Sequence, residues 1–300
     1  MGNSIDWKSY NRNLINRGSI TFWFAPDIID QWMAPSSGKR GAPTFYSEAA
    51  IEVLSIIRFR FSLTLRSTQG FAESLMELMG VALPVPNYTT LCRRLNGLTV
   101  HLQGKISKGA VHVVVDSTGL KVFGEGEWKV RQHGYSKRRD WRKLHLAVDA
   151  SNNQIISAAL TTNSFKDNQL FDELIDEIPE GINQVSADGA YDSKDCYSKA
   201  KERGFKPVFP PRRGARLKMH GNCLGPKDPR DEYIREIRNI GRKQWKKNHN
   251  YHQRSLSETA MYRFKTILGG HLSSRDFDRQ ANEAFLKCQI LNQMKTPKFG

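Results

Sequence analysis

Short apolar runs with polar ends follow one another through the middle of the chain. The runs "VHVVVD" (111–116), "KLHLAVDA" (143–150) and "QIISAALTT" (154–162) are rich in β-branched residues, a pattern that favours strands. Asn152 and Asn153 stand between the second and third runs, and such a pair suits a tight turn. We therefore expect the second and third strands to form an antiparallel hairpin.

Helical and strand patterns alternate after this hairpin. Asp167 can cap a helix over "DNQLFDELIDEI", and "NQVSAD" (183–188) reads as the next strand. Asp192 can cap a second helix that Gly204 would end. A short strand "KPVFP" and two helices, at about 251–268 and 273–293, complete the pattern. This order predicts an α/β fold with one mixed sheet covered by helices.

Two acidic residues stand at the ends of predicted strands. Asp116 ends the first strand and Asp188 ends the fourth. The two carboxylates could therefore meet at neighbouring strand tips. The alternative for each is a plain turn residue, because Asp before Ser or Gly bonds readily to its own backbone.

The first hundred residues are mostly helical in pattern. Ser47 with Glu48 can open one helix, Gly80 can close the next, and Asn87 or Thr89 can cap a third. We expect a helix-turn-helix variant whose third helix offers Arg93 and Arg94 to a DNA groove; an ordinary helical bundle fits the pattern equally well. The expected domains are 1–105, helical and binding DNA ends, and 106–300, catalytic, with a basic insertion near 206–248.

The charge of the chain points to a polyanionic partner. Its formal net charge is +16, and residues 199–247 hold 16 basic and 5 acidic residues, a balance that suits phosphate contacts; a solvated surface is the alternative. Trp245 lies among these cations. It could stack on a displaced base, although covering the core is the more usual role of a tryptophan.

Other features restrict the class of protein. No run approaches the 18 apolar residues of a membrane span, and the polar N-terminus is unlike a signal peptide. The four cysteines form no CxxC pair, which favours reduced thiols in a reducing compartment and argues against a structural zinc site.

The segment "YHQRSLSETAMYRFK" (251–265) carries four polar side chains at gaps of 3, 4 and 7. On a helix that starts at Tyr251, they fall within an arc of about 60°, and Leu256, Ala260, Phe264 and Ile267 fall on the opposite side. The four residues are Tyr251, Arg254, Glu258 and Lys265. Ser255 with Glu258 also forms a capping box, which explains Glu258 but not the alignment of the other three.

One carboxylate among cations suits a phosphate site with a metal ion. Asp116, Asp188 and Glu258 would supply the hard oxygen ligands that hold Mg²⁺ or Mn²⁺. Two such ions about 4 Å apart can activate the attacking oxygen and stabilise the leaving one in phosphodiester cleavage.

"DSTGLKV", "ADGAYDS" and "YHQRSLSETAMYRFK" resemble the three motifs of bacterial insertion-sequence transposases of the DDE class, specifically the insertion sequence five type. The last segment matches the Y-x2-R-x3-E-x6-K signature at every spacing, and the resemblance covers about 45–295. It implies an RNase-H-like catalytic fold and a metal-binding triad of Asp116, Asp188 and Glu258. It also implies that Tyr251, Arg254 and Lys265 contact phosphates at the transposon end.

The function expected from this resemblance is DNA transposition. The chain would bind the terminal inverted repeats, cut with two Mg²⁺ or Mn²⁺ ions, and join the 3′-hydroxyl ends to target DNA, as a homodimer on DNA in the bacterial cytoplasm. Two alternatives stay open: a nuclease of the same fold that cuts without joining, and a DNA-binding regulator whose acidic residues are structural.

Overall fold

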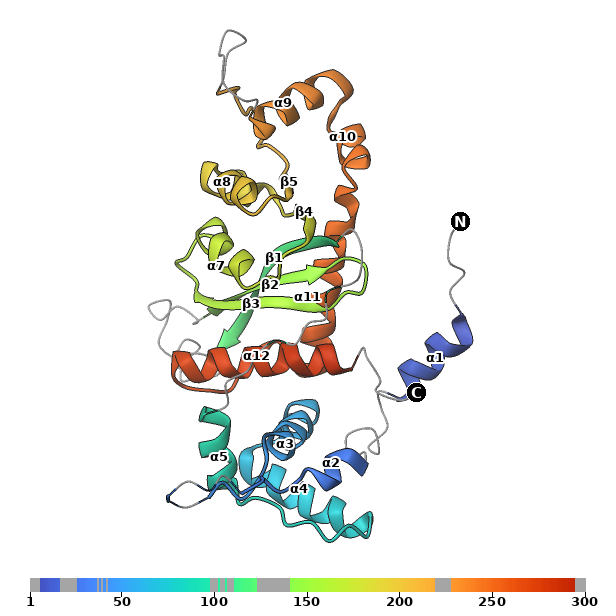
Figure 1. The fold of residues 1–300 in the computed structure, drawn as a ribbon, viewed down its shortest axis with the longest axis vertical. Helices are drawn as coiled ribbons and strands as arrows, with labels where there is room; N and C mark the ends of the chain where they lie inside the picture. Colours follow the sequence, from blue (N-terminus) through green and yellow to red (C-terminus); the bar gives the residue numbers. More distant parts are fainter. Residues whose placement is uncertain are drawn as a thin grey trace, which may run out of the picture. The chain divides into compact units, whose positions relative to one another are not determined.

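The computed structural model of the chain describes residues 6–16, 26–36, 38, 40–41, 43–97, 102, 106, 111–122, 141–218 and 228–294. Tertiary contacts divide it into two compact units, the N-terminal helices and the sheet with its covering helices (Figure 1). Each unit is described by itself below. The domain boundary expected near residue 105 lies outside the described residues.

The second unit is built on a six-stranded mixed sheet with the order β3-β2-β1-β4-β5 and with β6 paired to β1. The strands are β1 (Val111–Val122), β2 (Trp141–Asp149), β3 (Ile155–Thr162), β4 (Ile182–Ser186), β5 (Lys206–Val208) and β6 (His271–Leu272). β2 is antiparallel to both β1 and β3, whereas β4, β5 and β6 are parallel to the strands that they pair with. The expected hairpin and the expected RNase-H-like mixed sheet are therefore confirmed.

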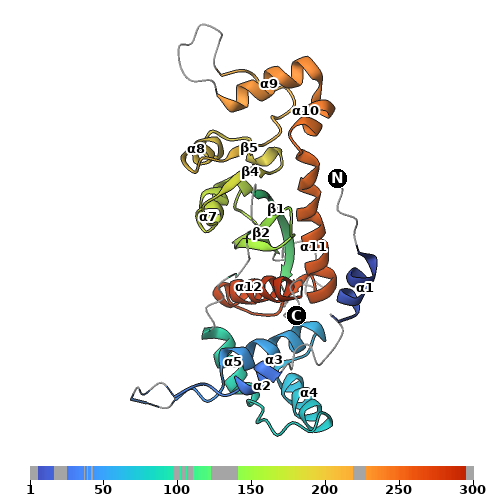
Figure 2. The same cartoon turned by 45° about the vertical axis from the view of Figure 1, so that its right-hand side comes forward.

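Helices cover both faces of this sheet. Figures 1 and 2 show α7 and α8 on one face and α11 running past β1 on the other. The elements after β3 are η2 (Asp167–Leu170), α7 (Phe171–Asp176), η3 (Gly189–Tyr191), α8 (Lys194–Glu202), α9 (Pro229–Ile240), α10 (Arg242–Asn248), η4 (Tyr251–Arg254), α11 (Ser255–Leu268) and α12 (Phe277–Gln293).

Burial on the α7 and α8 side explains why these segments fold as they do. Val113, Val115 and Ala147 project from β1 and β2 into a cluster with Phe171 of α7 and Cys196 of α8, all with no exposed surface. On α11 the buried positions include Ala260 and Phe264, as the helical spacing predicts, whereas Leu256 and Ile267 are half-buried. The sheet is thus a rigid platform with a helix on each side of its central strand.

Two local expectations need correction. The helix expected from Asp167 begins as the 3₁₀ turn η2, and Lys166 occupies its N-cap. Ser193, not Asp192, caps α8, because the Ser193 hydroxyl accepts the amide hydrogen of Cys196 and Asp192 pairs with Arg230. Gly204 does follow α8 with a positive φ of 71°, the left-handed conformation that glycine adopts most easily.

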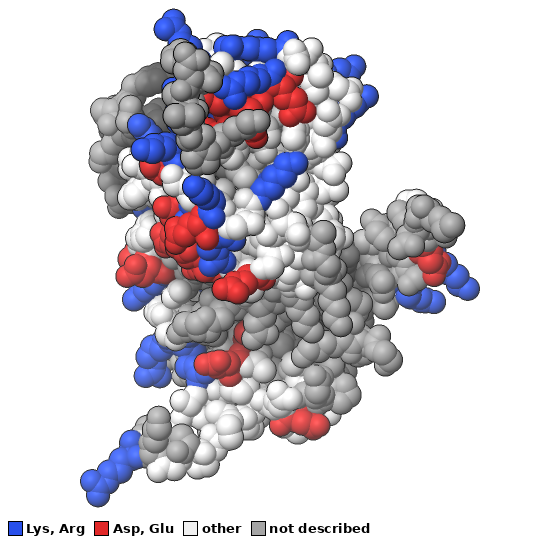
Figure 3. Space-filling model, turned by 45° about the horizontal axis from the view of Figure 1, so that its top comes forward, with Lys and Arg blue, Asp and Glu red and all other residues white. Residues whose placement is uncertain are grey.

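The basic insertion contains the two helices α9 and α10, where only irregular chain was expected. Asp228 caps α9, and Pro229 begins it, a favourable N-terminus. Basic and acidic side chains mix on this end of the unit (Figure 3), with exposed cations at Arg235, Arg238, Lys243 and Lys247.

The N-terminal unit is helical, as expected. It contains α1 (Trp7–Asn16), α2 (Pro26–Asp30), α3 (Glu48–Arg60), α4 (Leu65–Leu78) and α5 (Tyr88–Gly97). Ser47 caps α3, Gly80 follows α4 with a positive φ, and Asn87 accepts the amide hydrogen of Thr89 at the start of α5. Trp32 is fully buried in their core. No helix of the described residues is long and apolar enough to cross a membrane.

Candidate active site

Asp116 lies on β1, and Asp188 follows closely after β4, the parallel neighbour of β1. Val114 of β1 pairs with Ser186 of β4, and each aspartate stands two residues further along its chain. We expected Asp116 at the end of its strand. It lies in the middle of β1 instead, because β2 pairs with β1 as far as Lys121. Asp188 follows β4 and caps η3, accepting the amide hydrogen of Ala190. Strand pairing therefore brings the two carboxylates together.

Both carboxylate oxygens of Asp116 are engaged. The Ser117 amide donates to Oδ1 over 2.9 Å, and the Arg254 guanidinium donates to Oδ2 over 2.7 Å. The Ser257 hydroxyl lies 3.2 Å from the same Oδ2. Burial raises the pKa of Asp116, and Asp188 raises it further; these effects outweigh the three donors, which lower it. The net direction is upward, as expected for two acids that share a half-buried site.

Glu258 stands in the first turn of α11, and the same guanidinium reaches it. Arg254 Nη1 bonds to Asp116, and Arg254 Nη2 donates to Glu258 Oε1 over 2.5 Å. The Glu258 side chain is 58% exposed, compared with 16% for Asp116. One arginine therefore bridges a half-buried carboxylate of the sheet and an exposed carboxylate of the helix.

The polar arc expected on a single helix is in fact split between two elements. Tyr251 and Arg254 belong to the 3₁₀ turn η4, and α11 begins only at Ser255. Tyr251 is buried; burial raises the pKa of its phenol, Arg254 lowers it, and Asp188, Asp116 and Glu258 raise it. Lys265 lies two turns beyond Glu258 and is exposed.

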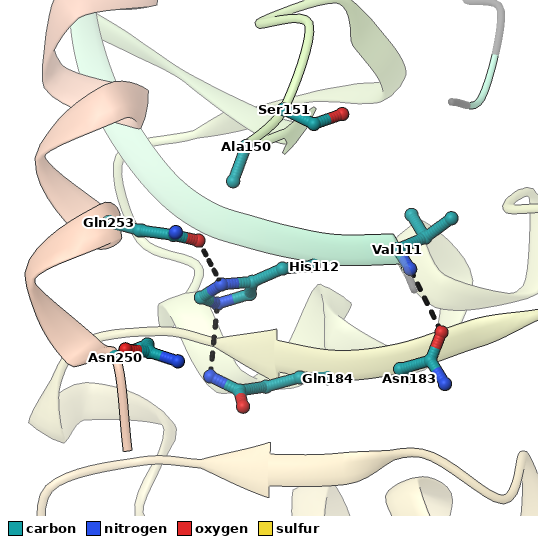
Figure 4. Close-up of a pocket in the computed structure, with 8 residues that line it drawn as sticks. All are labelled: Val111, His112, Ala150, Ser151, Asn183, Gln184, Asn250 and Gln253. Carbon is teal, nitrogen blue, oxygen red and sulfur yellow. Dashed lines mark hydrogen bonds between the residues drawn. The ribbon is translucent and has the colours of Figure 1, made fainter. Parts of the chain in front are cut away.

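A hydrogen-bond network fixes η4 against the start of β1 (Figure 4). His112 Nδ1 bonds to Gln253 Oε1 over 2.5 Å, and His112 Nε2 lies 2.8 Å from the Ser186 hydroxyl. Gln184 also reaches His112 Nε2, over 3.3 Å. Since Gln253 precedes Arg254, this network anchors the turn that presents the guanidinium to the acids.

The donor set suits a divalent cation, and a cation of the chain itself lies within it. Asp116, Asp188 and Glu258 offer only hard oxygen atoms. Among the residues that the structure describes, however, no three acidic, histidine or cysteine side chains are close enough to enclose a metal ion. The Arg254 guanidinium occupies the position between Asp116 and Glu258 and stands in for such a cation. These carboxylates therefore offer the type of oxygen atom that a divalent cation prefers, and in this structure Arg254 is the cation that Asp116 and Glu258 bind.

Trp245 is a core residue, which corrects its inclusion among DNA-contacting residues. Its side chain has no exposed surface, and its ring packs at 5.2 Å from the Tyr233 ring and 6.1 Å from the Tyr251 ring. A base cannot stack on an indole whose faces are covered. The core alternative considered from the sequence accounts for Trp245.

The two arginines of α5 have different surroundings. Arg93 is exposed. Arg94 is half-buried, and its Nη1 donates to the backbone carbonyl of Tyr46 over 2.9 Å. Arg94 therefore braces the helical unit, and Arg93 is the freer of the two to meet a ligand.

Sequence reasoning missed Ser257, His112 and Gln253. Ser257 is fully buried and its hydroxyl donates to the Arg254 carbonyl over 2.6 Å. Two signals were present: Ser257 precedes Glu258 within the quoted motif, and His112 interrupts an otherwise apolar strand. Neither signal identifies the side chain with which the residue forms a hydrogen bond, because that depends on contacts between segments far apart in the sequence.

Comparison with known proteins yields a family match. Residues 107–293, more than half of the chain, match a family described as "Transposase DDE domain", and residues 15–125 match a second family with the same description.

Solved structures of transposases are also similar to this chain. The piggyBac transposase synaptic complex with hairpin DNA shares 14% identity, with 94% of this chain and 74% of that chain covered, at a TM-score of 0.42. The Drosophila P element transposase strand transfer complex shares 10% identity over 96% and 86% of the two chains, at a TM-score of 0.31. Likeness at these TM-scores is loose, so the sequence match is the stronger finding.

Proposed function

The chain belongs to the family of transposase DDE domains, and from this premise we propose that it cuts and joins DNA at the ends of an insertion sequence. It would bind the terminal inverted repeats, hydrolyse the phosphodiester at each end, and transfer the freed 3′-hydroxyl to a target phosphodiester. The second step exchanges one phosphodiester for another, so no ATP is required. The insertion sequence five type expected from the motif spacing is part of this proposal.

The observation that supports the proposal is that Asp188 acts electrostatically on Asp116 and that Arg254 links Asp116 to Glu258. A pair of divalent cations, Mg²⁺ or Mn²⁺, would supply activation of the attacking oxygen and stabilisation of the leaving oxygen. Asp116 and Asp188 would hold the cations from the rigid sheet. Glu258 would complete the ligand set from α11.

The neighbouring polar residues suit DNA phosphates. Arg254 offers a planar fork that matches two phosphate oxygens as well as two carboxylates. Lys265 is exposed on α11, the helix that follows η4, where it can neutralise a second phosphate. Asp188, Asp116 and Glu258 all influence the phenol of Tyr251 electrostatically, and its hydroxyl would hydrogen-bond a phosphate oxygen at the cut.

Recognition of the end sequence is assigned to the helical unit, with Arg93 as the residue that reads a base. A pair of chains would hold the two ends together, so we propose a homodimer on DNA. The exposed cations of α9 and α10 suit additional backbone contacts, which contribute affinity without sequence preference.

The test is direct. Purified protein is incubated with duplexes that carry the terminal repeats of its own element, with and without Mg²⁺, and the nicked and joined products are mapped on sequencing gels. Cleavage at the repeat boundary followed by joining supports the proposal. Cleavage without joining indicates a nuclease, and metal-independent binding without cleavage indicates a regulator.

A further inference from the structure

Arg254 makes two charge-assisted hydrogen bonds to acidic groups of the site and joins two elements by doing so. Its Nη1 donates to Asp116 Oδ2 over 2.7 Å and its Nη2 to Glu258 Oε1. The side chain is 23% exposed, so the pair is partly screened from water. Such bridges are stronger and more directional than ordinary surface ion pairs.

We infer that Arg254 is an internal counter-ion that competes with the divalent cation for Asp116 and Glu258, and that a DNA phosphate draws it away. This inference rests on the proposed function, since it concerns the regulation of the same site. It assigns Arg254 two alternative partners, the carboxylates before DNA binds and a phosphate afterwards.

Competition follows from geometry and charge. Asp116 Oδ1 accepts the Ser117 amide, and Oδ2 accepts both Arg254 and Ser257, so a cation at Asp116 must displace one of these donors. Arg254 alone carries a positive charge among them, and a guanidinium beside a divalent cation is repelled. Glu258 can turn toward Asp188 only after Arg254 releases it.

Exchange to phosphate requires little rearrangement of the protein. The Arg254 backbone is held by the Ser257 hydroxyl and by the neighbouring Gln253–His112 bond, so the end of the side chain can turn while the turn η4 stays in place. Nη1 and Nη2 of Arg254 each bond one oxygen of a different carboxylate, and a phosphate can offer two oxygen acceptors to the same two groups.

The consequence is that binding of DNA and binding of the divalent cation affect each other. Without DNA, Arg254 lowers the affinity for the cation and keeps the acids from assembling a cutting site. A bound DNA end removes this competition, and linkage requires that the cation in turn strengthens end binding.

The experiment measures Mn²⁺ affinity by electron paramagnetic resonance on the full chain without DNA. The variants are Arg254→Gln, which removes the charge, Arg254→Lys, which keeps the charge but loses the two-pronged fork, and Lys265→Gln as the matched control. Lys265→Gln removes one positive charge from α11, two turns beyond Glu258. Thermal melting confirms that each variant is folded.

We expect Arg254→Gln to bind Mn²⁺ at least about fivefold more tightly than the wild type, with a smaller gain for Arg254→Lys and almost none for Lys265→Gln. Terminal-repeat DNA should tighten Mn²⁺ binding in the wild type but not in Arg254→Gln. Equal or weaker affinity in Arg254→Gln, or an equal gain in Lys265→Gln, would overturn the inference.

The two proposals fail separately. Mn²⁺ affinity without DNA reports on Arg254 even if the terminal repeats are never cut. Cleavage and joining by the wild type, together with unchanged Mn²⁺ affinity in Arg254→Gln, would instead leave the proposed function standing and remove Arg254 as the competitor.

Discussion

At the scale of the residue, the site is organised around a half-buried carboxylate. Burial and Asp188 together raise the pKa of Asp116 above its ordinary value, despite the amide, guanidinium and hydroxyl donors around it. The ionised form of Asp116 therefore carries a free-energy cost. An enzyme tolerates such a cost where the charge has a function.

Replacement of any proposed metal ligand should abolish cleavage. Asp116→Asn, Asp188→Asn and Glu258→Gln remove one charge each with little change in shape, and we expect a loss of at least about a hundredfold in cleavage rate. Binding of the terminal repeats, measured by gel shift, should be nearly unchanged. Asp172→Asn, an exposed acid of α7, is the control and should cleave normally. A variant of the three that cuts at the wild-type rate would not be a ligand.

Lys265→Ala tests a phosphate contact. The slope of log affinity for the DNA end against log salt concentration should become shallower by about one unit, because one counterion fewer is released. Lys201→Ala on α8, an exposed lysine on the other side of the sheet, should leave the slope unchanged. Binding isotherms at several salt concentrations give these slopes. Equal slopes for the wild type and Lys265→Ala would mean that Lys265 does not contact a phosphate.

At the scale of the element, sequence patterns predicted what local chemistry controls. The β2–β3 hairpin, the caps of α3 and α5 and the buried positions Ala260 and Phe264 follow from turn residues, capping oxygens and helical spacing. The extension of β1 beyond Asp116 could not be predicted from the sequence, because "STGLKV" contains no apolar run. This segment is a strand because it pairs with β2. The 3₁₀ turn η4 was likewise hidden, since helical spacing does not distinguish it from the first turn of α11.

Trp245 should behave as a structural residue of α10. Truncation to Ala leaves a cavity beside Tyr233 and Tyr251, and we expect a loss of about 3–5 kcal/mol in unfolding free energy. Trp245→Phe should lose less, because it keeps part of the ring packing. Lys247→Ala on the same helix should change stability by under about 0.5 kcal/mol. Chemical denaturation measures all three, and an unchanged midpoint for Trp245→Ala would contradict its place in the core.

The pair Glu283–Lys287 makes the anchoring of α12 sensitive to acid. Glu283 accepts the amide hydrogens of Ser273 and Ser274 and lies 3.1 Å from Lys287 Nζ. Burial raises the pKa of Glu283, but Lys287, the Ser273 amide and the Ser274 hydroxyl lower it, and its net position is below the ordinary 4.5. Its stabilising effect is therefore present above pH 4.5 and is lost as the pH falls through the lowered pKa.

Glu283→Gln should therefore destabilise the chain at neutral pH by about 3–5 kcal/mol, because it leaves a buried lysine without its charge partner. The difference in melting temperature between wild type and variant should shrink between pH 5 and pH 3 as Glu283 protonates. Arg279→Gln, which breaks the exposed pair with Asp276, is the control, with an expected effect of under about 1 kcal/mol. A difference that stays constant with pH would mean that the Glu283 charge does not matter.

At the scale of the whole molecule, the division of labour between the two units could be predicted only in outline. The change from helical to strand patterns near residue 110 separates them in the sequence. Which arginine of α5 is available to DNA could not be foreseen, because the contact of Arg94 with the Tyr46 carbonyl joins residues that lie 48 positions apart.

Arg93 should therefore matter for sequence preference and Arg94 for stability. In a full chain inactivated by Asp116→Asn, Arg93→Ala should reduce the preference for terminal repeats over random duplex by about 1–3 kcal/mol. Arg94→Ala should lower the melting temperature and leave that preference intact in the folded fraction. Competition gel shifts with both duplexes measure this preference. An unchanged preference in Arg93→Ala would mean that another residue recognises the bases.

The central position of β1 in the sheet also affects how fast the backbone amides of the site exchange hydrogen for deuterium. Around Asp116, β1 is paired with β2, and Val113 and Val114 are also paired with β4, so we expect amide hydrogens in this part of β1 to exchange with deuterium only when the sheet itself unfolds. Those of η4 belong to a four-residue 3₁₀ turn, a short and weakly bonded element, and should exchange much sooner. Asp116 thus lies on the slowly exchanging part of the site, whereas Arg254 lies on a turn whose amides should exchange sooner.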